Sequence, residues 1–397
     1  MQYEGDNMAG LKRSNRSMVL GILHEQGSMS RKRIAQQLKL TPAAITKIVG
    51  EMIDEGLIVE GRALSSSGAG RREIEVSINP RRYCALGLLI NLKQAIVSST
   101  WLDGTVIFSE EIAIEPAAES DSTVSMLCRR LLELADTYIA DRETILGVGI
   151  AVRGITSPDE RRVVNSFGAL DKTDYPLCNM VEHFTSLPSV MSNNVRSLFS
   201  AHTFLSHNKS VSSSFFLRCE YGIGAAMSIN GQIWKGSSQQ CAEIGHIPVV
   251  RSGGKLCSCG KRGCLETISS PSAIIEDTVD LFISRGSYSG NTLSLDDIIS
   301  LAKGGDGQVA QIVDSALSAL SQALKGVIYT IDPDEIVLYG RMFDNEYIMA
   351  RLLSEMHIGV DENHAKSIKK SEFNLTLEDK AASLTMVDYF FSKGGLM

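Results

Sequence analysis

The sequence predicts an α/β protein in which a small winged helix-turn-helix, residues 1–79, precedes a larger domain of two similar lobes, residues 80–397. With 397 residues the chain is longer than one hydrophobic core usually organises. Apolar residues at helical spacing dominate the first part, whereas glycine-rich strands dominate from Tyr83 onward. A group of three strands followed by helices then occurs twice, which indicates two lobes with a cleft between them.

The N-terminal part is expected to contain three helices. The first covers residues 15–26, ends at Gly27 and places these apolar residues at helical spacing: Met18, Val19, Ile22 and Leu23. Ser30 caps a second helix over residues 31–38, and Thr41 caps a third that starts directly after it. Two helices joined by a tight turn after a first helix are the plan of a helix-turn-helix.

Two strands follow over residues 57–64 and 72–79, and the serine- and glycine-rich tip between them predicts a β-hairpin wing. In such a module the third helix enters the major groove of DNA, while basic side chains hold phosphates or the minor groove. The expected DNA-binding residues are Arg31, Arg33, Thr41, Ala43, Ala44, Thr46, Lys47, Arg71 and Arg72.

Charge supports this interpretation, because the formal net charge is −7 but the N-terminal part is basic. Between residues 11 and 47 a single acid, Glu25, stands against these basic residues: Lys12, Arg13, Arg16, Arg31, Lys32, Arg33, Lys39 and Lys47. A local basic surface on an acidic protein indicates a polyanion partner for that end, and we expect double-stranded DNA. The alternative is a three-helix interaction domain with a solvated charged face.

The most distinctive stretch is Glu243–Glu266, EIGHIPVVRSGGKLCSCGKRGCLE, in the second lobe. It contains one histidine and three closely spaced thiols, separated by glycines that allow tight turns. Four such ligands are the set that a closed tetrahedral Zn²⁺ site needs. We therefore expect a structural Zn²⁺ bound by His246, Cys257, Cys259 and Cys264. The alternative is a patch of ordinary buried thiols beside a core histidine.

Bulk composition is that of a globular protein, with 44% hydrophobic and 21% charged residues. No run of about 18 uninterrupted apolar residues exists, and the N-terminus lacks the apolar core of a signal peptide. Cysteines outside the cluster are scattered, which is typical of a reducing compartment: Cys84, Cys128, Cys178, Cys219 and Cys241. We therefore expect a cytoplasmic protein without a membrane partner.

The chain resembles the ROK family, which contains bacterial repressors, open reading frames and sugar kinases. The resemblance covers about residues 10–392 and is most specific in E-x-G-H at Glu243–His246 and C-x-C-G-x-x-G-C-x-E at Cys257–Glu266. The N-terminal winged helix resembles the repressor branch, because the kinases lack it. The resemblance implies an actin-like (ribonuclease H-like) two-lobed ATPase-type fold for the larger domain.

The resemblance also implies a sugar site, at the positions Asn193, Asn194, Glu243, His246 and Glu266. Amides and carboxylates suit this role because sugar hydroxyls both donate and accept hydrogen bonds. His246 would bind zinc through one ring nitrogen and face the sugar through the other. The metal would then brace the wall of the sugar site rather than act in catalysis.

Departures from the kinase pattern indicate that the chain has no catalytic residues. Asn194 stands where the kinases have the aspartate that takes a proton from the sugar hydroxyl, and an amide cannot accept that proton at neutral pH. The first glycine-rich phosphate loop of the kinases is also missing, so we do not expect ATP to bind. Its positions are occupied by Leu89, Asn91, Leu92 and Lys93.

The sequence therefore favours a transcriptional repressor that a sugar or sugar derivative releases from its operator. Two half-sites of a palindromic operator would be met by a homodimer or homotetramer. The alternative is a sugar kinase for ATP-dependent hexose phosphorylation with a DNA-binding appendage. A protein partner as the signal stays open, because nothing in the sequence tests it.

Overall fold

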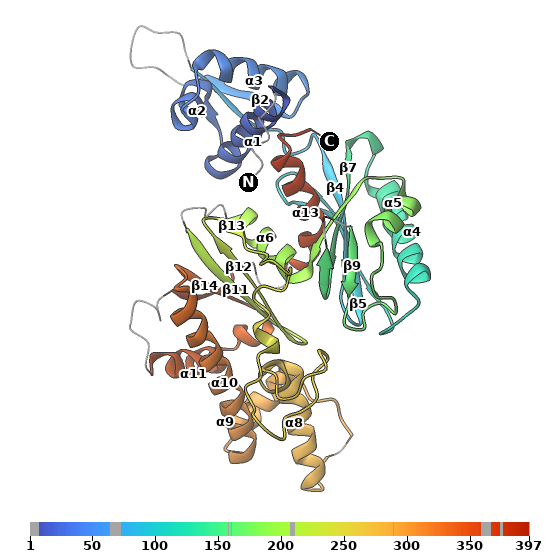
Figure 1. Ribbon diagram of the computed structural model, residues 1–397, viewed down its shortest axis with the longest axis vertical. Helices are drawn as coiled ribbons and strands as arrows, with labels where there is room; N and C mark the ends of the chain where they lie inside the picture. The colour runs from blue at the N-terminus through green and yellow to red at the C-terminus, as the bar shows by residue number, and fades with distance from the viewer. Residues whose placement is uncertain are drawn as a thin grey trace. The chain divides into compact units, whose positions relative to one another are not determined.

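The computed structural model describes residues 8–63, 73–157, 159, 161–206, 211–288, 290–358, 367–373 and 376–396. The chain divides into two compact units. Unit 1 consists of Met1–Lys209 and Leu377–Met397, and therefore holds the winged helix together with the first lobe. Unit 2, Ser210–Thr376, is the second lobe (Figure 1).

The winged helix-turn-helix forms as the sequence predicts. Its elements are α1 (Met8–Gln26), β1 (Met29–Ser30), α2 (Arg31–Leu38), α3 (Pro42–Asp54), β2 (Ile58–Ala63) and β3 (Ile74–Ile78). The Ser30 hydroxyl accepts the Arg33 N–H at 3.3 Å, and the Thr41 hydroxyl accepts the Ala44 N–H at 3.2 Å, so both predicted caps are confirmed. β3 pairs with β1 and β2 in an antiparallel sheet.

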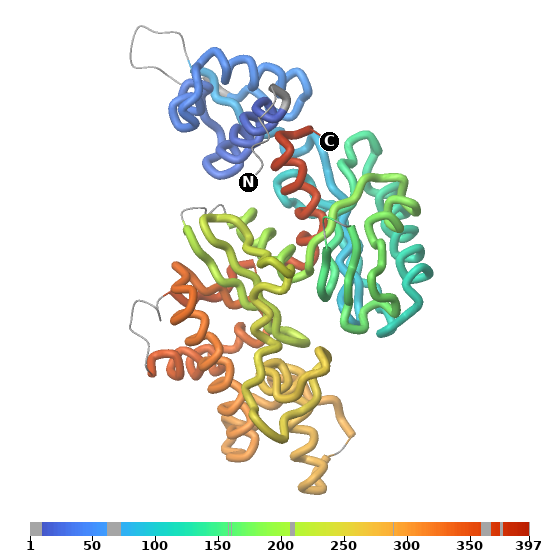
Figure 2. The backbone as a smooth tube through the Cα atoms, in the orientation of Figure 1, coloured from blue at the N-terminus to red at the C-terminus, as the bar shows by residue number. Residues whose placement is uncertain are grey.

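Helix α1 buries more of its surface than the sequence predicts. Val19 and Leu20 are fully buried, and Leu23 is nearly so, whereas Met18 is 39% exposed. The sequence did not identify Leu20, which is buried because a second element covers α1. The C-terminal helix α13 (Glu378–Ser392) packs on α1, so the last turn of the chain returns to the first helix (Figure 2).

The first lobe is a five-stranded sheet in the order β10-β7-β4-β5-β6, with helices on both faces (Figure 1). β4, β5 and β6 are antiparallel, while β7 and β10 are parallel to β4. Its elements are β4 (Cys84–Ile90), β5 (Gln94–Trp101), β6 (Val106–Ala113), α4 (Ser120–Tyr138), β7 (Ile145–Val152), α5 (Leu177–Thr185), β10 (Ser189–Asn193), α6 (Asn194–Ser206) and α13. The β-hairpin β8 (Ile155–Ser157) and β9 (Arg162–Asn165) follows β7.

Helix α13 lies close against this sheet because the strands carry glycine where the helix crosses them. A Cβ on Gly149 would collide with the Ala382 carbonyl oxygen, and one on Gly87 would lie 2.6 Å from the Ser383 nitrogen. The buried Thr100 hydroxyl also donates to the Ser383 hydroxyl at 2.9 Å. These contacts fix α13 on the sheet, since any larger residue in the strands would push the helix away.

The second lobe repeats the plan of the first. Its sheet has the order β13-β12-β11-β14-β15, so in each lobe an antiparallel meander of three strands is followed by two strands parallel to its first strand. This confirms the prediction of two similar lobes. The elements are β11 (Ser213–Cys219), β12 (Ile223–Ile229), β13 (Gln232–Ile233), α7 (Glu266–Ser269), α8 (Pro271–Ser284), α9 (Leu295–Lys303), α10 (Gly307–Ile331), β14 (Glu335–Tyr339), α11 (Glu346–His357) and β15 (Ile368–Lys370).

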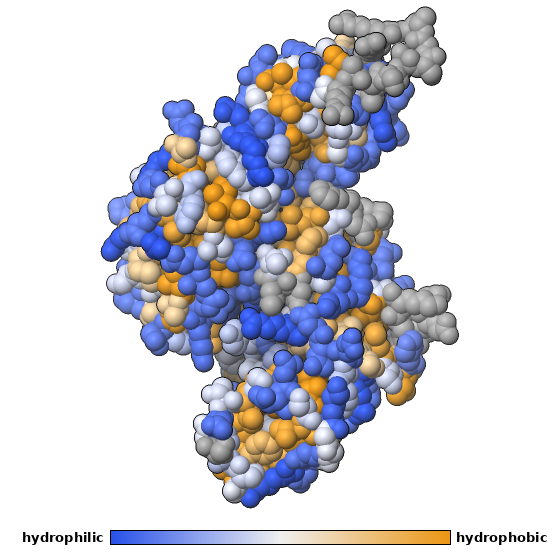
Figure 3. Space-filling model, turned by 180° about the vertical axis from the view of Figure 1, so that it is seen from behind, coloured by the Kyte–Doolittle hydropathy of each residue, from blue (hydrophilic) through white to orange (hydrophobic). Residues whose placement is uncertain are grey.

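On the face that Figure 3 shows, hydrophilic residues predominate and apolar residues form separate patches. Among the described residues, no helix combines the length and the apolar character that crossing a membrane requires. All eight cysteines lie in described segments and are free thiols.

Candidate functional site

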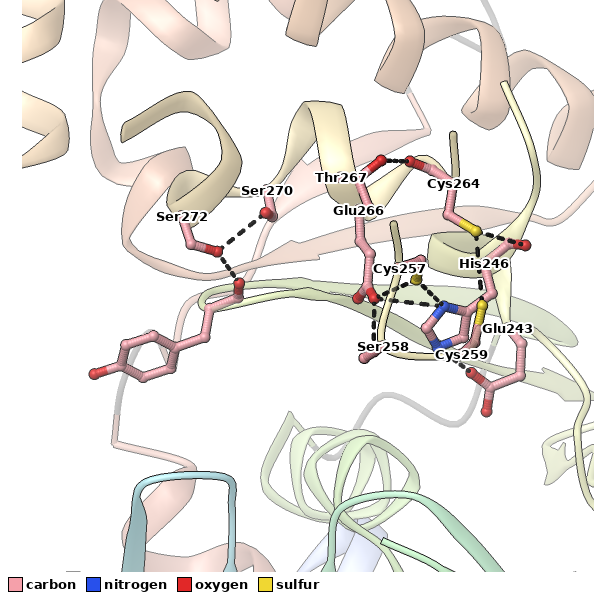
Figure 4. A network of polar contacts seen from close by, with 11 residues as sticks. Glu243, His246, Cys257, Ser258, Cys259, Cys264, Glu266, Thr267, Ser270 and Ser272 are labelled. Atoms are coloured by element: carbon pink, nitrogen blue, oxygen red, sulfur yellow. Dashed lines mark hydrogen bonds and ion pairs between the residues drawn. The ribbon is translucent and has the colours of Figure 1, made fainter. Parts of the chain in front are cut away.

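The loop between β13 and α7 brings the four predicted metal ligands together (Figure 4). One ligand atom from each of His246, Cys257, Cys259 and Cys264 lies within 4.8 Å of the others. The Cys259 and Cys264 sulfurs are 3.7 Å apart, and Cys257 Sγ lies 3.4 Å from His246 Nδ1. Two thiolates bound tetrahedrally to one Zn²⁺ at ~2.3 Å lie roughly 3.8 Å apart. The four donors could therefore hold a metal ion.

Tight turns make this geometry possible. The Cys257 N–H donates to the Lys261 carbonyl at 2.8 Å, and the Gly260 N–H donates to the Cys257 carbonyl at 2.9 Å. Gly263 has a φ of +71°, and a Cβ there would lie 2.5 Å from the Val250 carbonyl oxygen. Only glycine fits this position, and it lets the chain return to place the third thiol beside the first two.

Two of the three thiols are poor anions in this environment. Burial raises the pKa of the Cys257 thiol, and burial also raises the pKa of the Cys264 thiol. A metal ion that binds here must therefore displace these protons, because the thiolate is the ligand.

Two carboxylates flank His246 on different sides of its ring (Figure 4). Glu266 Oε1 lies 3.5 Å from Nδ1 and 3.0 Å from Cys257 Sγ, whereas Glu243 Oε2 lies 4.0 Å from Nε2. Nδ1 therefore faces the thiols, and Nε2 faces Glu243. The sequence placed Glu266 only among the sugar contacts, but the structure also brings it to the metal ligands. A Cβ on Gly222 would lie 2.9 Å from Glu266 Oε2, so this glycine makes room for the carboxylate.

The predicted amides Asn193 and Asn194 belong to unit 1, where β10 ends and α6 begins. Asn193 acts as a helix cap: its Oδ1 accepts the N–H groups of Val195 at 2.9 Å and Arg196 at 3.2 Å. Its Nδ2 donates to the Gly154 carbonyl at 2.8 Å. Asn193 is thus held in place by its own lobe, a structural role that the sequence motif did not reveal.

Asn194 makes a buried amide pair. Its Nδ2 donates to Asn91 Oδ1 at 2.9 Å, and the two residues are 5% and 7% exposed. Leu89, near the end of β4 and two residues before Asn91, is buried in a small apolar cluster with Ile96, Ala151 and Ala382. Asn194, Asn91 and Leu89 therefore offer two amides and an apolar side chain, none of which accepts a proton from a hydroxyl at neutral pH.

The predicted DNA-binding residues of α3 are available to a partner. Thr41, Ala43, Thr46 and Lys47 are exposed, and Ala44 is half-buried. Arg33 is exposed, while Arg31 forms an ion pair with Glu60 at 2.7 Å. Arg71 and Arg72 lie outside the described residues.

The predicted basic surface is smaller than its sequence suggests. Arg16 was expected on it, but its side chain is completely buried. Lys12 and Lys32 are paired with Glu51 at 2.7 Å and with Glu73 at 3.2 Å. The expectation for Arg16 was wrong because its partners, described below, lie far away in the sequence.

Two family models match the chain, the ROK family over residues 103–381 and a winged helix-turn-helix DNA-binding family over residues 13–59. The ROK match covers most of the chain. The chain belongs to the ROK family. It is 26% identical over 353 residues to the DNA-binding transcriptional dual regulator NagC of Escherichia coli, which covers 88% of this chain and 85% of NagC. It is 21% identical to the xylose repressor of Bacillus subtilis, with 84% of each chain covered.

Solved structures establish the fold. A ROK family transcriptional regulator, a homologue of the Escherichia coli Mlc protein, superposes with a TM-score of 0.82 at 23% identity and covers 97% of this ROK chain and 98% of its own. A ROK glucokinase of Streptomyces griseus, solved with glucose and AMPPNP, gives a TM-score of 0.64 at 18% identity. It covers 77% of this chain and 98% of its own. The protein therefore has the two-lobed, actin-like fold of the ROK kinases together with an N-terminal winged helix.

Proposed function

We propose that this ROK protein is a DNA-binding transcriptional repressor that a sugar or sugar derivative releases from its operator. Residues 1–79 would form the DNA-binding domain and residues 80–397 the sensing domain. The observation that carries the proposal is the combination of an exposed recognition helix with a kinase-like lobe in which Asn194 pairs with Asn91 where a base is needed. The names of the relatives support it, since they include an N-acetylglucosamine repressor and a xylose repressor.

The DNA contacts would come from the first turns of α3 in the major groove and from basic side chains around it. Arg33 and Lys47 are exposed, and described residues give them no ion pair in competition with phosphate. A single winged helix has limited affinity, so we propose a homodimer or homotetramer on a palindromic operator.

The sugar would be bound by the amides and carboxylates that match the family pattern: Asn193, Asn194, Glu243, His246 and Glu266. Of these, Glu243 is the most exposed carboxylate, with 37% of its side chain accessible. Its carboxylate oxygens, which can accept hydrogen bonds from hydroxyl groups, are therefore accessible from solvent.

We propose Zn²⁺ as the metal in the second lobe. Three thiols and one imidazole form a complete tetrahedral set, which leaves no open position for a substrate or a reacting water. The ion would therefore have a structural role. It would fix the ring of His246 and the adjacent Glu266, both of which belong to the proposed sugar site.

A two-part experiment tests the proposed function. The operator is first selected by the purified protein from a randomised pool of duplex DNA, and thermal shift then compares N-acetylglucosamine, xylose, glucose and the 6-phosphates of the two hexoses. We expect one duplex to be enriched, one sugar class to raise the melting temperature, and that sugar to weaken DNA binding. A protein that selects no duplex, or that turns over ATP with a sugar in a coupled assay, would contradict the proposal.

A further inference from the structure

Arg16 of α1 is the largest completely buried side chain among the described residues. Its Nη1 and Nη2 donate to the two carboxylate oxygens of Glu55, at 2.9 and 2.5 Å. Its Nε donates to the Gly394 carbonyl at 2.7 Å. Glu55 is the C-terminal cap residue of the recognition helix α3, and Gly394 follows directly on the C-terminal helix α13. One guanidinium thus joins the ends of these two helices.

A second contact lies at the same joint. Arg82, in the segment that leaves the winged helix, donates from Nε to the Glu55 carbonyl at 2.9 Å. Its guanidinium stacks over the ring of Tyr83, which in turn meets the ring of Phe390 in α13 at a centroid distance of 5.5 Å. The end of α3 is therefore connected to α13 by two independent arginines.

Helix α6 reaches the winged helix at another point. The ring of His24, near the end of α1, lies 3.9 Å from the ring of Phe204, and its Nε2 lies 2.8 Å from the Phe204 carbonyl oxygen. Phe391 of α13 packs beside both rings, at 5.9 and 5.8 Å. Phe204 belongs to the last turn of α6, whose first residue is Asn194. A helix of 13 residues, ~20 Å long, therefore connects the proposed sugar amide with the winged helix.

Helices α6 and α13 also contact each other. The Thr385 hydroxyl donates to the Ser197 hydroxyl at 3.1 Å, and the Ser200 hydroxyl donates to Asp388 at 3.4 Å. Because α13 is fixed on the glycine-bearing strands, a shift of α6 or of the sheet must be transmitted to the end of α13. The bidentate Arg16–Glu55 pair would be broken by such a shift. The buried guanidinium would then lack its charged partner, which is energetically unfavourable.

We propose that Arg16 is a positioning residue that couples the recognition helix to the sensing lobe. It holds α3 in one orientation on α13. Helix α6 connects Asn194 of the proposed sugar site with His24 of the winged helix, so a movement of α6 on sugar binding would reach this joint. A sugar that binds one arrangement of the lobe more tightly than the other would thereby change the orientation of α3 toward DNA. This inference rests on the proposed function and names the route of its regulation.

Gly394→Ala tests the joint without substituting any residue of the winged helix or of the proposed sugar contacts. Gly394 has a φ of +71°, and a Cβ there would lie 2.6 Å from the Arg13 carbonyl oxygen and 2.8 Å from Arg16 Cβ. Gly286→Ala is the matched control, because Gly286 has a φ of +66° after α8 and nothing within 4 Å of the added Cβ. Both variants carry the same backbone strain, but only one disturbs the joint.

The measurement is the factor by which N-acetylglucosamine, xylose, glucose or a hexose 6-phosphate weakens binding of the duplex that the wild-type protein selects. Gly394→Ala is expected to keep the wild-type melting shift with the sugar, while this factor falls about tenfold; Gly286→Ala keeps both. A Gly394→Ala protein that responds like Gly286→Ala overturns the inference.

Two further outcomes are decided in advance. If Gly394→Ala does not fold, Glu55→Gln replaces it, because this change weakens the fork from its solvent-facing side, and a wild-type response of Glu55→Gln overturns the inference. If the wild-type protein binds no duplex, or none of these sugars and sugar phosphates releases it, the proposed function fails instead. The two failures are thus distinguishable.

Discussion

Two regions hold polar groups in fixed geometry: the candidate metal loop of unit 2, residues 246–264, and the arginine joint of unit 1, where Arg16 contacts Glu55 and Gly394. They are built differently. All four predicted metal ligands come from residues 246–264, and one bound ion would satisfy them together. Arg16 and Gly394 are 378 residues apart, and their partners are already satisfied within the protein. The loop should therefore depend on something added to the chain, whereas the joint depends on the fold of the whole unit.

The largest expected effect breaks the loop alone. Cys259→Ser should release the metal and lower the stability of unit 2, because three ligands no longer complete the tetrahedron. At a zinc concentration of 1,000 Kd, the lost binding corresponds to about 4 kcal/mol. Zinc content by atomic emission and unfolding of the purified protein check this.

Cys241→Ser is the control for this change, because Cys241 is a half-buried thiol outside the cluster. The winged helix should stay folded in both variants. One equivalent of zinc retained by Cys259→Ser would show that the assignment of the site is wrong.

The next effect addresses the joint. Glu55→Ala leaves the Arg16 guanidinium buried without its charged partner, which costs about 3 kcal/mol of unfolding free energy. Arg16→Met, of similar volume, leaves the Gly394 carbonyl and Glu55, whose side chain is 39% exposed and can be hydrated. Arg16→Met should therefore cost less than half as much in denaturant unfolding. Equal costs would mean that the pair contributes packing rather than charge compensation.

The contrast between the two regions also explains what the sequence could predict. The cluster of His246 and three thiols, and the caps Ser30 and Thr41, depend on neighbours within about 20 residues, so their spacing predicts them. Arg16 looked like a DNA-facing residue because its partners cannot be inferred from neighbouring positions. The same reason explains Leu20, which is buried although no helical pattern within the winged helix required it.

For the proposed sugar-binding residues, too, the sequence predicted the residue type but not the tertiary contacts. The motif identified Asn194 as a missing base, but the buried partner Asn91 is 103 residues away and needed the strand pairing of the fold to be found. The motif also could not show that Asn193 caps α6 or that Glu266 touches Cys257. Residue type predicted the chemistry of these positions, while their partners are a property of the tertiary structure.

A third prediction tests this amide pair as another long-range contact. Asn91→Ala leaves a buried N–H of Asn194 without its acceptor, which should cost about 2 kcal/mol of unfolding free energy. The double change with Asn194→Ala should cost less than the sum of the single changes, because the orphaned donor is removed as well. Denaturant unfolding of the wild type, the two single variants and the double variant completes this double-mutant cycle. Additive losses of unfolding free energy would argue against a coupled pair.

The smallest effect concerns a residue that neither region constrains. Lys47 is exposed on α3, whereas Lys32 on α2 is held by Glu73 at 3.2 Å. Lys47→Ala should weaken binding of the selected duplex by about 1 kcal/mol and reduce the slope of log K against log salt by about one, because one phosphate contact is lost. Lys32→Ala should change the slope less, since Glu73 already neutralises its charge. Both variants should unfold within about 0.5 kcal/mol of wild type, because both are surface changes. Equal salt slopes for the two variants would mean that the DNA-facing surface extends onto α2, and that an ion pair in the free protein does not remove a lysine from it.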